Sequence, residues 1–543
     1  MIRFTLILVL SFACVCRAQN KAESKQNPSG NPKLVVGIVV DQMRYDFLFR
    51  YWARYSDSGF KKLVNEGFLC KNVHYNYIPT YTGPGHASVY TGCTPSVNGI
   101  VSNDWRDRIS GKNIYCVDDS TVKGVGASGR MSPRNLFVTT MTDELRLSSR
   151  ETSKVIGIAL KDRGAILPAG HMANAAYWYD YTSGNWVSST YYMLNLPTWV
   201  NDFNKRQLQA QYLSKPWETL QPINEYTESI TDDNAYEEPF RKELKPVFPH
   251  NLPVILKADS ELLKKTPFGN TMTKEFAIAV MKGEDMGSGH TTDFLSISFS
   301  STDYVGHQFG VDAIETEDTY LRLDRDLAEL LTFLESKVGK KDLLVFLTAD
   351  HGAAHNAAFM RAQKIPAGVI DGNKLGKRLE AYLDSLFGAG KYISALSSHD
   401  VYLNDSVFKT GKISRKEIEN AAKIFLKNTE GIAEVFSADE LYDSSDNSPR
   451  SMLSRGAHPL RKADIYFVMK PGWMDYDERG TTHGSGYDYD THVPLLFWGG
   501  KIPHGSSVQY HNITDVAPTI CTYLNIAFPN GCTGKVITEI FGN

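Results

Sequence analysis

Six short apolar runs constrain the fold of this chain more than any other feature. Each is five to seven residues long, and they span 34–40, 155–160, 294–299, 343–347, 465–469 and 494–498. Stretches with helical character lie between them, among them 316–334 and 415–426. Strands that alternate with helices build a sheet that helices cover on both faces. We therefore expect an α/β fold with a mostly parallel central sheet and helices on both faces.

Two long segments interrupt this alternation. Residues 169 to about 267 are rich in Tyr, Trp, Asn and Pro and lack clean periodicity. Residues 354 to about 462 separate two strands by far more than one crossover requires. We expect a single large domain over residues 19–543 in which both segments are insertions, the first forming a cap.

The N-terminus is typical of an export signal. Arg3 supplies a positive charge, residues 4–16 are apolar, and Ala18 ends a small-residue cleavage site. The apolar run is shorter than the roughly 20 residues that a membrane-spanning helix needs. No later stretch is long and apolar enough to span a membrane. We expect cleavage after Ala18 and a periplasmic or secreted protein.

Charge and cysteine content narrow the possible partners and ligands. The 58 basic residues nearly cancel the 61 acidic ones, so we expect no nucleic-acid partner. Five cysteines remain after cleavage, and some should pair in an oxidising compartment. Proximity favours a Cys521–Cys532 bridge, while Cys70 and Cys116 form a second candidate pair that leaves Cys93 free. None lies in a CxxC motif, which argues against zinc bound through thiolates.

Acidic residues follow three of the predicted strands. Asp41 ends the first run, Asp303 lies just after the run at 294–299, and Asp350 lies just after 343–347. A single Asp at such a position is often only the cap of the next helix. Ligands of open parallel sheets, however, bind beyond the carboxyl ends of the strands. Three acids at three such ends therefore predict a common site.

Histidines near these acids point to metal binding. Asp303 and His307 are four residues apart and would share one face of a helical turn. Asp350 and His351 adjoin at a bend, and His483 lies in a glycine-rich loop. Three carboxylates and three imidazoles suit Zn²⁺. Two Zn²⁺ would exceed the three carboxylate charges, and the surplus positive charge would suit an anionic substrate.

A nucleophile and two cations are also candidates for this site. Thr82 precedes Pro84 and a helical stretch, so it lies at or just before a helix N-terminus, where anions bind. A plain N-cap is the alternative for Thr82. Lys161 and Arg163 are two residues apart after a strand, which would put both on one face, ready to bind phosphoryl oxygens. A solvated surface pair is the alternative for them.

At these residues the chain resembles the alkaline phosphatase superfamily. It looks most like the PafA-type periplasmic alkaline phosphatases, with the nucleotide pyrophosphatase/phosphodiesterases as nearer cousins than the sulfatases. The shared motifs appear in family order over most of the chain: Asp41, Thr82 in Thr-x-Pro-Gly-His, Asn103 in Ser-Asn-Asp, Lys161-Asp-Arg163, Asp303-x-x-Gly-His307, Ala-Asp350-His351-Gly and Thr-His483-Gly-Ser. Sulfatases need Cys or Ser where Thr82 stands, which argues against that activity.

The resemblance implies a role for each of these residues. Two zinc ions per chain are implied, one held by Asp303, His307 and His483 and the other by Asp41, Asp350, His351 and the oxygen of Thr82. Asn103, Lys161 and Arg163 would bind the phosphoryl group, whereas His86 and His492 would be structural. The implied activity is a zinc-dependent phosphate-monoester hydrolase that forms a phosphothreonine at Thr82 and releases inorganic phosphate.

Two other functions stay open at this point. The first is a phosphodiesterase or nucleotide pyrophosphatase of the same superfamily. The second is a non-catalytic exported relative that binds metal or phosphate, although such a relative would typically lack the nucleophile or a ligand, and none is missing here. We expect small phosphate monoesters as substrates and a monomeric protein.

Overall fold

A computed structural model of the chain describes residues 30–127, 129–409 and 413–542. The predicted export signal lies outside this range. The core of the fold is a ten-stranded sheet with the strand order β18-β2-β17-β10-β1-β9-β6-β7-β8-β5. The five neighbouring strands from β10 to β7 are parallel, which confirms the predicted fold class. These strands are β10 (Leu343–Thr348), β1 (Leu34–Val40), β9 (Asp293–Phe299), β6 (Val155–Ala159) and β7 (Ala175–Asp180).

The strands at both ends of the sheet complete it in mixed orientation. β17 runs antiparallel to β10 and to β2, and β18 runs parallel to β2. At the other end β8 is antiparallel to β7, and β5 to β8. The bounds are β17 (His492–Gly499), β2 (Phe68–His74), β18 (Gly505–Asn512), β8 (Asn185–Ser189) and β5 (Gly124–Val125).

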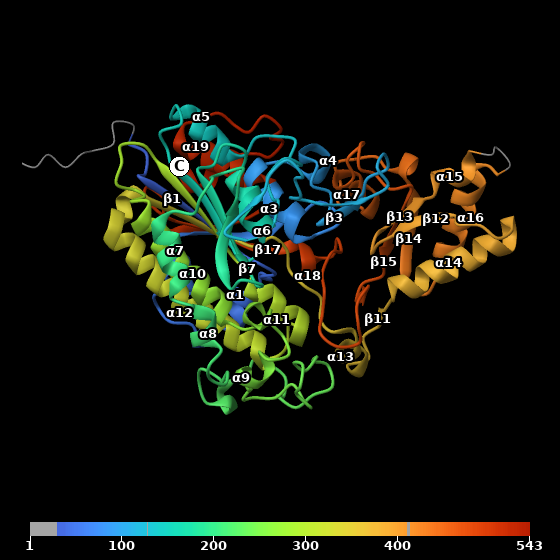
Figure 1. Ribbon diagram of the computed structural model, residues 1–543, viewed down its shortest axis with the longest axis horizontal. Helices are drawn as coiled ribbons and strands as arrows, with labels where there is room; N and C mark the ends of the chain where they lie inside the picture. Colours follow the sequence, from blue (N-terminus) through green and yellow to red (C-terminus); the bar gives the residue numbers. More distant parts are fainter. Residues whose placement is uncertain (1–29, 128, 410–412, 543) are drawn as a thin grey trace, which may run out of the picture.

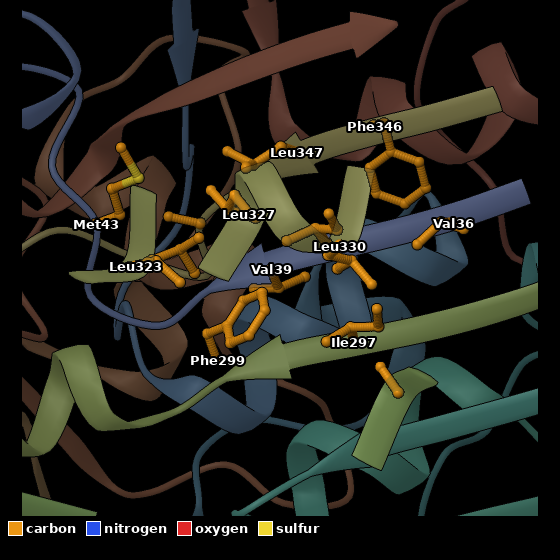
Figure 2. Close-up of a cluster of buried hydrophobic side chains, with 14 of the residues drawn as sticks. Val36, Val39, Met43, Ile297, Phe299, Leu323, Leu327, Leu330, Phe346 and Leu347 are labelled. Carbon is orange, nitrogen blue, oxygen red and sulfur yellow. The ribbon is translucent and has the colours of Figure 1, made fainter. Parts of the chain in front are cut away.

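Helices cover both faces of the sheet (Figure 1). On one face α10 (Phe268–Gly283) and α12 (Ile314–Val338) contact the sheet, and α11 (Ser301–Phe309) packs on both helices. On the other face α6 (Asp162–Ala169) contacts the sheet, and α3 (Thr82–Thr91), α5 (Met141–Ser148) and α19 (Val516–Leu524) pack together with it. Figure 2 shows Leu323, Leu327 and Leu330 of α12 beside Ile297 and Phe299 of β9. The leucines recur at helical spacing, so α12 presents one apolar stripe to the sheet. Burial on both faces explains why the central strands are continuous apolar runs.

A second sheet lies in a lobe at one side of the molecule (Figure 1). It is antiparallel, with the order β12-β13-β15-β14, and α14 and α16 pack against it. The run at 465–469 is β15 of this sheet, so the prediction that it joins the central sheet was wrong. An apolar run shows that a strand is buried but not in which sheet. The bounds are β12 (Ile393–Leu396), β13 (Asp400–Leu403), β14 (Ile432–Ser437), β15 (Ile465–Met469), α14 (Gly372–Phe387) and α16 (Arg415–Lys427).

The first predicted insertion starts later than 169. Strands β7 and β8 fall within it but extend the central sheet, because their Tyr, Trp and Val side chains are buried there. The rest contains α7 (Thr198–Lys205) and α8 (Leu208–Tyr212), which pack on α10, and α9 (Leu252–Ile255). Among the described residues no helix is both long enough and apolar enough to cross a membrane.

All five described cysteines are free thiols, so neither predicted disulfide is present among them. Cys70 is buried in β2 with the main core, whereas Cys116 belongs to a separate cluster that includes Trp105. Cys532 lies against the end of α3, where a Cβ added to Gly92 would be 2.7 Å from its sulfur.

Candidate active site

The three acids meet at one edge of the sheet because β10, β1 and β9 are neighbours and parallel. Asp41 follows β1 directly, Asp303 lies in the first turn of α11, and Asp350 lies two residues beyond β10. The backbone N–H of Asp41 donates to Phe299 O at 3.0 Å, which joins the ends of β1 and β9. All three carboxylates are essentially buried.

Six side chains form two groups of three at this edge. Within each group the ligand atoms lie within 4.8 Å of one another, and the groups are Asp303, His307 and His483, and Asp41, Asp350 and His351. The Nε2 atoms of His307 and His483 are 3.2 and 3.5 Å from Asp303 Oδ1. The rings of His351 and His483 stack with centroids 3.5 Å apart, so the groups adjoin.

Each of the three histidines is oriented through its Nδ1 atom. The three Nδ1–H groups donate to the backbone carbonyls of Thr481, Gly352 and Thr80, at 2.7, 2.9 and 2.7 Å for His307, His351 and His483 respectively. This bond leaves the Nε2 lone pair facing the carboxylates. A metal-binding histidine is typically oriented in this way.

Buried atoms without partners show that the residues fit a metal ion. Asp41 Oδ1, Asp350 Oδ2 and His351 Nε2 have no hydrogen-bond partner. An unsatisfied buried polar group costs about 1–3 kcal/mol. Lys161 Nζ lies between the two groups, 2.7 Å from Asp41 Oδ2 and 2.5 Å from Asp303 Oδ2. One ammonium cannot balance three carboxylates, whereas divalent cations with O and N ligands can.

The pKa shifts of the site residues reflect the same excess of negative charge. Burial, and next the neighbouring Asp350, raise the pKa of Asp41 well above its usual value. Burial opposes ionisation of Asp303 as well, but His307 and Lys161 hold the pKa of that carboxyl well below its usual value. Burial lowers the pKa of His351 to about 3, so its imidazole is neutral, as a metal ligand must be.

Thr82 is the first residue of α3, as expected from its sequence context. It is 1 % exposed, and Lys161 Nζ and Arg163 Nη2 lie 3.3 and 3.5 Å from its Oγ1. The backbone N–H of Gly83 donates to Asn103 Oδ1 at 2.8 Å, which turns the amide nitrogen of Asn103 away from the helix. A hydroxyl, two cations and a helix N-terminus thus converge on one point, an arrangement that suits a phosphoryl group.

Comparison with known proteins places the chain in a family. A family model for type I phosphodiesterases / nucleotide pyrophosphatases matches residues 35–493. The chain belongs to this family. The resemblance to the alkaline phosphatase superfamily noted from the motifs is thereby confirmed.

Several relatives match over nearly the whole chain. Alkaline phosphatase PafA of Elizabethkingia meningoseptica is 46% identical over 525 residues, 95% of this chain and 96% of that protein. A Myroides odoratus protein named calcium-transporting ATPase is 46% identical over 517 residues, 94% of each. Alkaline phosphatase PhoV of Synechococcus elongatus is 42% identical over 547 residues, 98% of each. A crystal structure of wild-type alkaline phosphatase PafA matches with a TM-score of 0.92 at 45% identity, covering 94% of this chain and 99% of that one.

In this protein Lys161 and Arg163 point into the site for a different structural reason from the one predicted. Lys161 is the N-cap of α6, and Arg163 lies in the first turn of that helix. Their common direction therefore comes from a helix start and not from an extended strand. Arg163 Nη1 donates to the hydroxyl of Tyr115 at 3.1 Å, and Tyr115 in turn donates to Asp162. Tyr115 thus holds Arg163 in place, and no sequence signal pointed to it.

Two further histidines make structural hydrogen bonds. His86 Nδ1 donates to Thr82 O at 2.9 Å, and its Nε2 is 2.9 Å from Ser298 Oγ. His492 Nε2 is 3.0 Å from Lys71 O. Asp490 is a supporting residue without a role assigned from sequence. Its Oδ2 accepts from the N–H groups of Gly484 and Ser485 at 3.1 and 2.7 Å, which shapes the loop that carries His483.

Proposed function

We propose that this chain is an alkaline phosphatase, a zinc-dependent phosphate-monoester hydrolase that acts through a phosphothreonine at Thr82. The observation that carries the proposal is the position of Thr82 at the N-terminus of α3, with Lys161 and Arg163 within 3.5 Å of its hydroxyl. Relatives named alkaline phosphatase at 46% and 42% identity, aligned over almost the whole chain, support it.

Two zinc ions complete the proposed site. Asp303, His307 and His483 would hold one, and Asp41, Asp350, His351 and the Thr82 oxygen would hold the other. Bound zinc would supply Lewis acidity, which favours deprotonated oxygen nucleophiles and offsets the charge of the phosphoryl group. The unpartnered atoms of Asp41, Asp350 and His351 support the second ligand set.

The remaining chemistry rests on residues of the chain. Thr82 Oγ attacks phosphorus in line, so that the Thr82 O–P bond forms while the bond to the leaving alcohol oxygen breaks. Lys161 and Arg163 bind the non-bridging oxygens, and the Asn103 amide donates to one of them. Water then attacks phosphorus from the vacated side, which regenerates Thr82 and releases inorganic phosphate. Phosphoryl transfer depends mainly on such positioning and charge stabilisation.

Charge favours a monoester over a diester. A monoester carries one more negative oxygen, which the buried Lys161 and the half-buried Arg163 would stabilise. A diester carries one negative charge fewer and would gain less from the same two cations.

Export and quaternary structure complete the proposal. The apolar N-terminal segment with its small-residue cleavage site supports secretion or transfer to the periplasm. Small phosphate monoesters are the proposed substrates, and the protein would act as a monomer. A non-catalytic role is disfavoured, since the proposed nucleophile and the proposed metal ligands all occur together at one edge of the sheet.

Metal content and substrate preference test the proposal together. Protein purified without chelator should carry about two zinc ions per chain, and EDTA should abolish its activity. Its kcat/KM for a phosphate monoester should exceed that for the corresponding methyl diester. One ion per chain, or full activity with magnesium or calcium alone, would contradict the zinc assignment. A preference for the diester would overturn the monoesterase assignment and leave the diesterase alternative.

A further inference from the structure

Gln42 lies between the two metal-ligand groups and contacts both. Its side-chain Nε2 donates to Asp303 Oδ1 at 2.8 Å, and its backbone N–H donates to Asp350 Oδ1 at 3.1 Å. The residue is 3% exposed and follows Asp41 directly. A single residue thus binds one carboxylate from each group and adjoins a third.

The backbone of Gln42 has a conformation that residues other than glycine rarely adopt. Its φ is +65°, in the left-handed region that disfavours any residue with a Cβ. Strain of this kind persists only where the surroundings determine the conformation, and it is concentrated at functional sites. Glycine would adopt this φ without strain. The presence of glutamine indicates that its side chain contributes something that glycine lacks.

Gly306 provides the space that the Gln42 amide occupies. It lies on α11 between Asp303 and His307, and a Cβ added there would be 1.9 Å from Gln42 Oε1. The amide oxygen therefore faces the glycine, and the amide nitrogen faces Asp303. This orientation is also the one that chemistry demands, because a carboxylate accepts hydrogen bonds and needs a donor.

The two hydrogen bonds constrain the orientation of one carboxylate in each ligand group. Gln42 occupies Asp350 Oδ1, and the other oxygen, Oδ2, is the one without a hydrogen-bond partner. It lies 3.5 Å from His351 Nε2. On Asp303 the Gln42 amide donates to Oδ1, the oxygen that also faces His307 and His483, while Oδ2 contacts Lys161. Gln42 thus fixes the rotation of one carboxylate in each ligand group.

We propose that Gln42 is a positioning residue that links the two metal sites, orienting Asp303 through its side chain and Asp350 through its backbone. The inference rests on the proposed two-zinc function. The two contacts come from different parts of one residue, so a mutation can remove the side-chain contact and keep the backbone contact. Gln42→Gly removes the side-chain contact, keeps the backbone N–H and tolerates the positive φ.

Gln42→Gly should weaken zinc binding at only one of the two sites. Loss of an outer hydrogen bond to a metal ligand typically lowers affinity about 10- to 100-fold. We expect that loss at the site of Asp303, His307 and His483, while the site of Asp350 keeps its affinity. The measurement is a chelator-competition titration of zinc. Crystals grown with one zinc equivalent, with anomalous scattering, identify the site that stays occupied.

Three further variants separate positioning from general damage. Gln42→Met keeps the length of the side chain but has no hydrogen-bond donor, so it should lower zinc affinity at the same site. It replaces the glycine variant if that variant folds poorly. Gly306→Ala should give the same pattern, because its methyl group displaces the Gln42 amide. Gln509→Met, at an exposed strand position, is the matched control and should bind zinc as the wild type does.

Activity at added zinc gives a second readout. The Gln42→Gly enzyme should recover most of its rate as zinc is raised, whereas Thr82→Ala should not. Wild-type affinity at both sites of Gln42→Gly, or equal weakening of both, would overturn the inference. A wild-type protein that binds fewer than two zinc ions would instead refute the proposed function, before any variant is compared.

Discussion

Joint replacement of Lys161 and Arg163 by alanine tests how the site recognises charge. Both cations face the Thr82 hydroxyl, with Lys161 Nζ at 3.3 Å and Arg163 Nη2 at 3.5 Å. Lys161 is 4% exposed, so water screens its charge little. A dianionic phosphoryl group at this point would contact both side chains, and a monoanionic diester would gain less from them.

The expected magnitude follows from these two contacts. A hydrogen bond to a charged group contributes about 1.5–3 kcal/mol. The two cations share one target and are not independent, so their joint effect should lie near the lower sum, about 3 kcal/mol. About 1.36 kcal/mol corresponds to a tenfold change in rate. Monoester kcat/KM should therefore fall about a hundredfold or more, and diester kcat/KM much less.

The assay compares kcat/KM for a phosphate monoester and its methyl diester in wild type, both single variants and the double variant. Zinc content is measured for each protein, because Lys161 also contacts Asp41 and Asp303. Arg163→Lys is the control that keeps the charge without the planar fork. Equal losses on both substrates would refute the reasoning and would mean that the pair only supports the fold or the metals.

Three other predictions concern the nucleophile, pH and the core. Thr82→Ala should lose several orders of magnitude in kcat/KM while it stays folded and zinc-loaded, and Thr82→Ser should retain substantial activity; an alanine variant within about tenfold of wild type would place the nucleophile elsewhere. Burial opposes the charge on His250, but bonds to Glu243 and Glu315 raise its pKa to about 9. The charged His250 therefore stabilises the folded state fully below its unfolded pKa of about 6.5, and this contribution is lost as pH rises through 9. In urea unfolding, the free energy of unfolding should fall more steeply between these pH values in wild type than in His250→Gln. Equal pH slopes in the two proteins would contradict the assignment. Leu327→Ala should lower the unfolding free energy by about 2–5 kcal/mol with kcat of the folded enzyme unchanged, and a loss under 1 kcal/mol would mean that α12 does not pack as Figure 2 shows.

The acids of the site were predictable from sequence because strand direction alone brings them together. Asp41, Asp303 and Asp350 each follow a strand of the parallel centre, and the carboxyl ends of parallel neighbours meet at one edge. Loop structure does not need to be known for this inference. The same reasoning failed for 465–469, because a buried strand can belong to either of two sheets and its apolar residues do not distinguish them.

Contacts that depend on backbone detail could not be predicted. Lys161 and Arg163 share a direction because α6 begins between them, a helix start that period-2 spacing did not indicate. The two bonds of Gln42 depend on a left-handed φ that no sequence motif specifies. The free thiols of the described cysteines were likewise not indicated by the spacing of these residues.

Helix α3, which carries the proposed nucleophile, is held in place by many contacts. All ten residues of α3 are buried, although its sequence is mostly small and polar and therefore carries no amphipathic pattern. Its position is instead set by specific contacts: His86 connects Thr82 O to Ser298 of β9, and Gly92 O accepts from the N–H groups of Thr533 and Gly534 at 2.9 Å each. Thr82 is thus anchored to the strand whose end leads into Asp303. A proposed nucleophile and a proposed ligand on one shared support would keep their spacing before substrate arrives, and such preorganisation is what electrostatic catalysis requires.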